Sequence, residues 1–131
     1  MRQLFILLFS LLITTNVSGE PYGYDFLSSS SEGHVFFVNT SSIKKDGDKS
    51  RIWTIRNIGL LDGVYEDDFK SYRALSEYDC KNDTYRILSL EAFDDIDATG
   101  KQETLRHPEL SRIEYIVPYS LESLVLNIAC K

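Results

Sequence analysis

Residues 72–93 alternate between two classes of side chain with a period of two, as a half-buried β-hairpin requires. In 72–80 the even positions hold tyrosine, alanine, serine and cysteine, whereas the odd positions hold arginine, leucine, glutamate and aspartate. The polar triplet 81–83 supplies a turn, and 84–93 continues the alternation on a returning strand. The pattern therefore predicts an antiparallel sheet that buries one of its faces.

The same hairpin predicts which side chains lie opposite each other. With residues 82–83 as a two-residue loop, Cys80 faces Tyr85 and Asp79 faces Arg86. A cross-strand pair of opposite charges of this kind contributes about 0.2–1 kcal/mol.

Earlier segments are also strand-like because they are rich in aromatic and β-branched residues. We expect these strands over 24–27, 34–39 and 51–58. A turn at 28–33 separates the first two, and the Asp46-Gly47 step indicates a hairpin between the second and the third. The acidic segment 59–70 is expected to be a solvated connection.

The pattern changes after the hairpin. An acidic, turn-rich stretch runs to Gly100, and a charged segment follows in which we expect a sixth strand over 111–117. Pro118 marks a break, and Ser120 is suited to cap a helix whose apolar positions are 121, 124, 125 and 128. This stripe is expected to pack on the sheet.

Cys130 does not fit that helix simply. It follows Leu121 by nine positions, which places it on the opposite side of an ideal helix. The helix must therefore end or turn before Cys130, or residues 125–130 form a strand instead, and periodicity alone leaves both alternatives open.

The N-terminus has the three regions of a secretory signal peptide: Arg2, an apolar run over 4–13, and polar residues that end at Gly19. A ten-residue run is too short to span a bilayer, and a buried core helix or the stub of an anchor is the alternative interpretation. We expect a signal peptide at 1–19 and one domain at 20–131. Because the first cysteine is far downstream, attachment of lipid directly after the signal is not expected.

Cys80 and Cys130 form an even pair in a chain that is expected to cross an oxidising compartment, so a disulfide is the default interpretation. Closing a loop of about 50 residues stabilises a fold by roughly 4 kcal/mol in chain-entropy arguments. The alternative, a catalytic thiol, needs a neighbouring histidine, and His34 and His107 are isolated in the sequence.

Charge and motifs disfavour several functions. The whole chain has a net charge of −6, and residues 20–131 hold 13 basic against 20 acidic side chains, which disfavours nucleic acid and anionic membranes as partners. The acidic loop from Asp95 to Gly100 resembles the start of a calcium loop, but Arg106 occupies the position of its bidentate glutamate. Without a nucleophile–base pair, phosphate loop or ligand set in the sequence, we expect no catalytic residues, no metal and no cofactor.

Two surfaces are candidates for recognition. If Arg73 and Arg86 share a sheet face, that face is the first place to look for an anionic partner. Aromatic residues are enriched at binding hot spots, although they more often lie in the core or half-buried on strands. The aromatic candidates are Trp53 and the tyrosines at 72, 78, 85, 115 and 119.

The order and spacing of several short motifs over nearly the whole of 20–131 resemble the surface-adhesin protein E family of Gram-negative bacteria. These motifs are Phe37-Val38-Asn39, Ser42-Ile43, Asp46-Gly47, Ser71-Tyr72-Arg73, Tyr78-Asp79-Cys80, Tyr85-Arg86-Ile87-Leu88-Ser89-Leu90, Val117-Pro118 and Cys130-Lys131. The resemblance implies an α+β fold, with an antiparallel sheet of about six strands and a C-terminal helix tethered to it by the Cys80–Cys130 disulfide.

The resemblance also implies a function. Founding members are displayed on the bacterial surface, bind host extracellular-matrix glycoproteins and can dimerise. A non-enzymatic, adhesin-like protein with a protein partner, and with a homodimer as one assembly to consider, is therefore expected. The alternative is a periplasmic or envelope-associated housekeeping protein without a host ligand. Founding members look lipid-anchored, whereas this chain lacks the signal-adjacent cysteine, which favours a periplasmic or secreted location.

Overall fold

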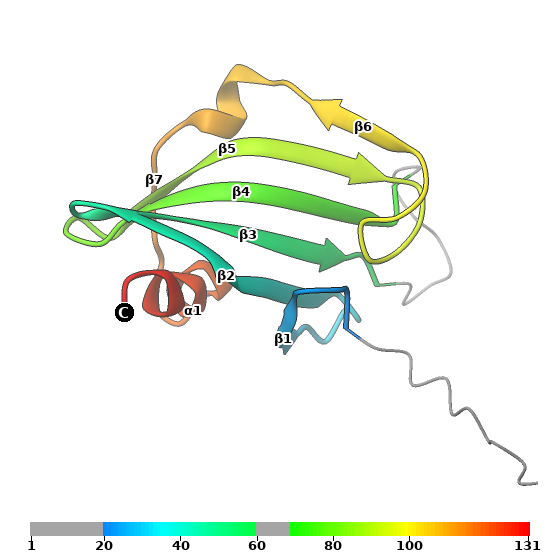
Figure 1. Cartoon of the computed structure of the whole chain (residues 1–131), viewed down its shortest axis with the longest axis horizontal. Helices are drawn as coiled ribbons and strands as arrows, with labels where there is room; N and C mark the ends of the chain where they lie inside the picture. The colour runs from blue at the N-terminus through cyan, green and yellow to red at the C-terminus, as the bar shows by residue number, and fades with distance from the viewer. Residues whose placement is uncertain (1–19, 60–68) are drawn as a thin grey trace, which may run out of the picture.

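The computed structural model describes residues 20–59 and 69–131, which form an antiparallel sheet with a C-terminal helix on one side (Figure 1). Six strands follow one another across the sheet in chain order: β1 (Asp25–Ser29), β2 (Val35–Asp46), β3 (Lys49–Asn57), β4 (Ser71–Asp79), β5 (Thr84–Phe93) and β6 (Gln102–Leu105). A 3-10 helix η1 (Pro108–Ser111), a two-residue strand β7 (Glu114–Tyr115) beside β5, and α1 (Leu121–Ala129) complete the chain. The predicted fold class is confirmed.

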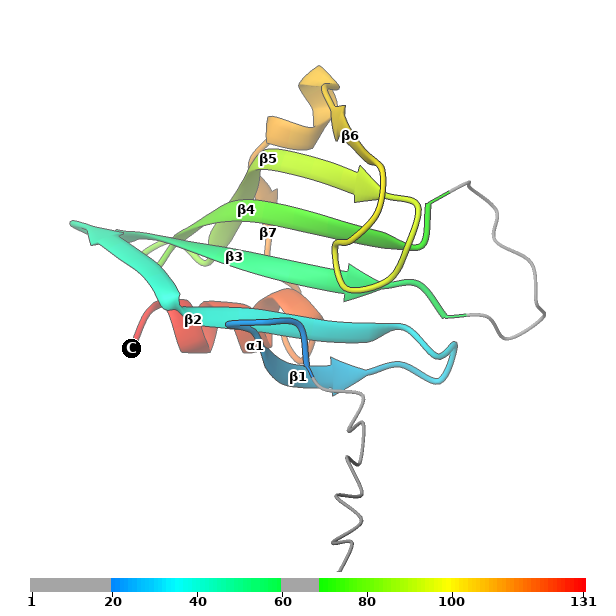
Figure 2. The same cartoon turned by 45° about the vertical axis from the view of Figure 1, so that its right-hand side comes forward.

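The expected signal peptide at 1–19 and most of the expected acidic connection, residues 60–68, lie outside the described residues. Figure 2 shows the segment after β6 running past the sheet through η1 and β7 to α1. This return brings the C-terminal helix to the end of the sheet where the β2–β3 and β4–β5 turns lie (Figure 1).

The last strand of the main sheet differs from the prediction. We expected a sixth strand over 111–117, but only Glu114–Tyr115 is a strand there, and the sixth strand is β6. Gln102, Glu103 and Thr104 are all exposed, so β6 has no apolar alternation and is held by its backbone ladder to β5. A strand of that kind leaves no periodic signal in the sequence.

The predicted register of the β4–β5 hairpin is wrong by two residues. Arg86 lies opposite Glu77, and Tyr85 lies opposite Tyr78. The loop is longer than predicted because the carboxylate of Asp79 accepts hydrogen bonds from the backbone N–H groups of Lys81 and Asn82 and from the Asn82 amide. An even shift leaves every side chain on its predicted face at this end of the hairpin.

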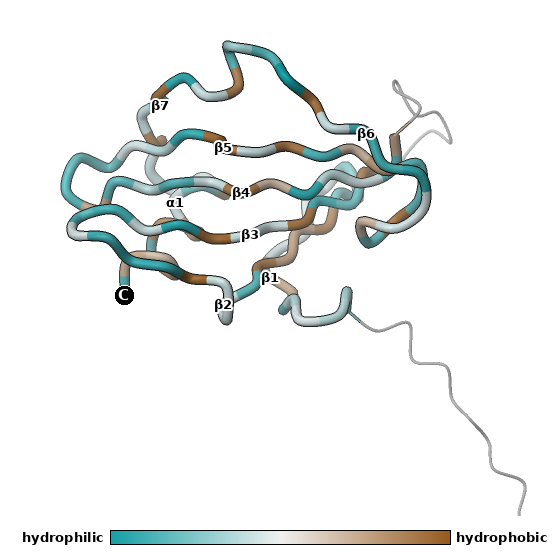
Figure 3. The backbone as a smooth tube through the Cα atoms, turned by 45° about the horizontal axis from the view of Figure 1, so that its top comes forward, coloured by the Kyte–Doolittle hydropathy of each residue, from teal (hydrophilic) through white to brown (hydrophobic). Residues whose placement is uncertain are grey.

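A β-bulge changes the predicted faces further along β5. Ile87 pairs with Ser76 and Ser89 pairs with Leu75, so Leu88 is the extra residue without an opposite partner. Ser89 and Leu90 therefore exchange the faces that strict alternation predicts. Each of β3, β4 and β5 carries both apolar and hydrophilic residues (Figure 3).

The C-terminal segment is a helix, not a strand. Ser120 caps α1, and its hydroxyl oxygen accepts a hydrogen bond from the N–H of Ser123. The helix ends at Ala129, immediately before Cys130. This agrees with the expectation that a helix in this segment must end or turn before Cys130. Val125 and Ala129 are buried against the sheet, whereas Leu124, which we expected to pack there, is 45% exposed.

The core lies between α1 and the sheet face that α1 covers. Its buried members are Val38, Ile52, Tyr78, Val125 and Ala129. The ring of Tyr78 stacks on that of half-buried Tyr85, with 5.8 Å between the ring centroids. We call this side of the sheet the helix face.

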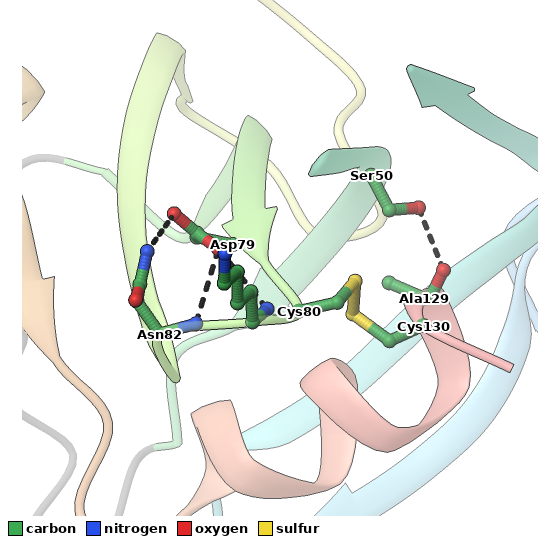
Figure 4. Close-up of a disulfide and its surroundings, with 7 residues drawn as sticks. Ser50, Asp79, Cys80, Asn82, Ala129 and Cys130 are labelled. Atoms are coloured by element: carbon green, nitrogen blue, oxygen red, sulfur yellow. Dashed lines mark hydrogen bonds between the residues drawn. A yellow bond between two sulfur atoms is a disulfide. The ribbon is translucent and has the colours of Figure 1, made fainter. Parts of the chain in front are cut away.

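The Cys80–Cys130 disulfide, predicted from the sequence, is present and joins the end of β4 to the end of α1 (Figure 4). The two Cα atoms are 5.7 Å apart. Next to it the Ser50 hydroxyl, which is fully buried, donates a 2.6 Å hydrogen bond to the carbonyl oxygen of Ala129. The C-terminus of α1 is therefore held by one covalent bond and one buried hydrogen bond.

We expect Ser50→Ala to lower the free energy of unfolding by about 1–1.5 kcal/mol, because it leaves the buried Ala129 carbonyl without its donor. Chemical denaturation of the oxidised protein measures the change. Ser111→Ala is the matched control, since its hydroxyl is exposed and bonds only a neighbouring carbonyl. Equal stability of the two variants would show that the Ser50 hydrogen bond is dispensable.

Candidate functional site

The sheet face opposite α1 has a cluster of charged side chains at its centre, contributed by β3, β4 and β5. We call it the arginine face, and its members are Lys49, Arg51, Arg73, Glu77, Arg86 and Glu91. Strand register brings them together: Glu77 lies between Arg51 and Arg86 on the neighbouring strands, and Arg73 lies opposite Glu91. The cross-strand arrangement fixes which charges face each other.

Glu77 is the centre of this cluster, and only 7% of its side chain is exposed. One carboxylate oxygen accepts from Arg51 Nε at 3.0 Å, and the other is 2.9 Å from an Arg86 terminal nitrogen. Lys49 Nζ lies 3.9 Å away. Burial opposes ionisation, but the hydrogen bonds and charges of the two arginines outweigh it and lower the pKa of Glu77.

Arg73 is held by a carboxylate and by aromatic rings. Its Nε donates a 2.7 Å hydrogen bond to Glu91, and its terminal nitrogen contacts the same carboxylate. The guanidinium carbon lies 5.7 Å from the ring centroid of Trp53 and 5.2 Å from that of Phe93. Stacking and ion pairing together restrict the rotamers of Arg73.

The two arginines that the sequence singled out do share a face. Arg73 and Arg86 both project to the side opposite α1, and each is ion-paired with a glutamate. Arg51 was among the arginines that the sequence suggested could cluster, whereas Glu77 and Glu91 were not identified as members of the cluster. The odd positions of 72–80 place Arg73 and Glu77 together, but the contribution of β3 depends on its pairing register.

The cluster carries more positive than negative charge. Four cationic side chains surround two carboxylates, in a chain whose net charge is −6. The side chains of Arg51 and Arg86 remain 52% and 39% exposed, so part of each guanidinium faces water. Guanidinium groups held in place present hydrogen-bond donors to carboxylates, sulfates or phosphates. The arrangement therefore has donors that could hold an anionic group.

The acidic loop after β5 is tied to the sheet by its own side chains. Asp97 accepts from the Asn57 amide at 2.7 Å, and Asp94 accepts from the Lys101 N–H at 2.7 Å. The backbone carbonyl of Asp95 accepts from buried Ser71. These oxygens satisfy protein donors, which gives the loop a structural role.

The two histidines lie apart in the structure too. His34 accepts a hydrogen bond from the N–H of Gly59 through Nδ1, while Nε2 lies 3.1 Å from Glu32. His107 precedes η1, and its carbonyl accepts from Leu110. Of the aromatic candidates, Tyr78 is buried, Trp53, Tyr72 and Tyr85 are half-buried, and only Tyr115 and Tyr119 are fully available on the surface.

The chain is a small sheet domain closed by one disulfide, with a cluster of charged side chains on the face opposite α1. The sequence pattern of the surface-adhesin protein E family matches residues 24–131, and the chain belongs to this family.

Solved structures of Haemophilus influenzae protein E share the fold. Crystal form II aligns with a TM-score of 0.62 and 16% identity, covering 86% of this chain and 91% of that one. The protein from a non-typeable strain aligns with a TM-score of 0.59 and 12% identity, covering 86% and 78%. No curated protein matches the sequence. Within the described ranges 20–59 and 69–131, no helix has the length and apolarity to cross a membrane.

Proposed function

We propose that this chain is an exported, non-enzymatic adhesin-like protein that binds a protein partner through the arginine face. Residues 1–19 are proposed to be its signal peptide, residues 20–131 its mature domain, and a host extracellular-matrix glycoprotein its class of partner. Membership of the surface-adhesin family supports the adhesin role. The observation that supports the location of the site is the excess of fixed positive charge at Arg73, Arg86 and their neighbours on an otherwise acidic chain.

A rigid sheet suits such a role. Arg73 and Arg86 are already held by carboxylates and rings before a partner arrives, so binding loses less side-chain entropy. Glycoproteins of the matrix class carry acidic side chains and acidic sugars, which arginine recognises with paired hydrogen bonds. Contacts of this type depend on ionic strength because the groups are half-exposed.

We expect the double variant Arg73→Gln/Arg86→Gln to bind immobilised extracellular-matrix glycoprotein about tenfold more weakly than the unmodified domain, which corresponds to 1.4 kcal/mol. The loss should shrink as salt is raised, since the removed interaction is electrostatic. Surface plasmon resonance on the oxidised mature domain measures both effects, after a melting curve has established that the variant is folded.

The matched control is Arg106→Gln/Arg112→Gln, which removes the same charge from two exposed arginines outside the sheet strands. If both double variants lost the same amount of binding affinity, the effect would be due to net charge, and the arginine face would be rejected as the binding site. Lys49→Glu, at a half-exposed lysine beside Glu77, tests the same face should the arginine pair be needed for folding. Absence of binding together with periplasmic fractionation of the full chain would favour the envelope-associated alternative.

A further inference from the structure

The helix face of the sheet contains a cavity of about 300 Å³ that the arginine face does not share. Its walls are largely aliphatic and aromatic, with Phe36 on β2, Ala74 on β4, Ile87 and Leu90 on β5, and Val125 on α1. A volume of this size is at the lower end for sites that hold a small organic ligand. The cavity therefore has the dimensions and the lining of a binding site for an apolar group.

The two ends of the cavity differ in how they are closed. At one end Val125 of α1 packs on Tyr78, which closes the cavity beside the disulfide. The other end, which we call the open end, is not covered by α1 (Figure 1), and exposed Arg56 is one of its lining residues. Tyr72 and Tyr78 both line the cavity and are six residues apart on β4, or about 20 Å along the strand. An extended chain fits this shape better than a round ligand does.

The charges at the two ends also differ. The guanidinium carbon of Arg56 lies 5.3 Å from the ring centroid of Tyr72, and no described residue offers it a carboxylate. The arginines of the opposite face, by contrast, are each paired with a glutamate. At the closed end, Glu122 is a lining residue, and its negative charge acts on Tyr78 and disfavours an anion there. An anionic group is thus favoured at the open end and disfavoured at the closed end.

We propose that this cavity binds a single-chain amphiphile, with its aliphatic chain along the helix face and one terminal carboxylate at Arg56. Arginine pairs with a carboxylate through two parallel hydrogen bonds, which fixes the direction of the bound chain. The phenol groups of Tyr78 and Tyr85 stay protonated inside, because burial raises the pKa of both and Glu122 adds to the effect. This site is separate from the arginine face, so either proposal can fail without the other.

Isothermal titration calorimetry with sodium decanoate, decanol and decylammonium chloride tests the charge preference on the oxidised mature domain. We expect decanoate to bind most tightly and decylammonium most weakly. Arg56→Gln should weaken the binding of decanoate about tenfold and leave the affinity for decanol unchanged. Arg106→Gln, at an exposed arginine that does not line the cavity, should change neither. Equal affinities of the three probes, or binding that is insensitive to Arg56→Gln, would overturn the proposal.

A second variant tests the location. Ala74→Leu adds three carbons inside the cavity and should reduce the affinity of decanoate and decanol together. Methyl NMR spectra of the unmodified domain should show decanoate-induced shifts at Ile87, Leu90 and Val125. Shifts confined to residues outside the cavity would contradict the site. Failure of all three probes to bind, with a concentration-dependent dimer in sedimentation velocity that Ala74→Leu disrupts, would assign the face to a second copy of the chain instead.

Discussion

The double variant Cys80→Ser/Cys130→Ser is expected to melt roughly 15–20 °C below the oxidised domain. The disulfide closes a loop of 50 residues, for which the chain-entropy argument gives roughly 4 kcal/mol. In a domain of this size each kcal/mol corresponds to about 4 °C or more in the melting temperature. Differential scanning calorimetry of residues 20–131 measures the difference.

Reduction supplies the control for this prediction. A reducing agent should lower the melting temperature of the unmodified domain to that of the double variant and should not change the variant itself. Native-state hydrogen exchange should then report faster exchange at Val125 and Ala129 than at the central strands, since α1 has lost its covalent tether. If the double variant melted at the same temperature as the oxidised domain, packing alone would be shown to hold α1 on the sheet.

Sequence alternation was sufficient to predict the central hairpin, because half-buried strands repeat every two residues. The strand 84–93 matches β5 at both ends. Its register was not predictable, since the loop length is set by three hydrogen bonds to the Asp79 carboxylate. The bulge at Leu88 could not be predicted from the sequence either, because an apolar residue at this position is compatible with either face of the sheet.

Other elements depended on contacts that one sequence does not record. The strand β6 carries polar, exposed side chains and is held by backbone bonds to β5. The helix α1 was predicted from its cap and stripe, but its end at Ala129 is fixed by Ser50 and the disulfide, which come from distant strands. Local propensity predicts the existence of an element more reliably than the residue at which contacts with other elements end it.

The candidate site, too, was predictable from the sequence only in part. Alternation placed Arg73 and Glu77 on one face, and the resemblance of the sequence pointed to a recognition role. The pairing of Arg51 with Glu77 depends on the β3–β4 register, and the stacking of Arg73 on Trp53 and Phe93 depends on three strands at once. A cluster assembled from three strands becomes visible only when the sheet order is known.

Glu77→Gln is expected to lower the free energy of unfolding by about 2 kcal/mol at pH 7, because hydrogen bonds to charged groups contribute more than neutral ones. The substitution keeps the shape of the side chain but removes the negative charge between Arg51 and Arg86. Those two cations then face each other across a neutral amide in a nearly buried position. Chemical denaturation at pH 7 measures the loss.

The pH dependence separates this charge effect from a packing defect. Because the pKa of Glu77 is lower in the folded state, its contribution is complete above the unfolded value of about 4.3 and is lost as the pH falls through the folded value. The gap in stability between the unmodified domain and Glu77→Gln should therefore narrow as the pH falls below the unfolded value and close once the pH is below the folded one. Glu103→Gln, at an exposed glutamate on β6, should show no gap at either pH. A gap that is constant with pH would mean that the amide disturbs packing, and that the arginines of this face do not depend on the Glu77 charge.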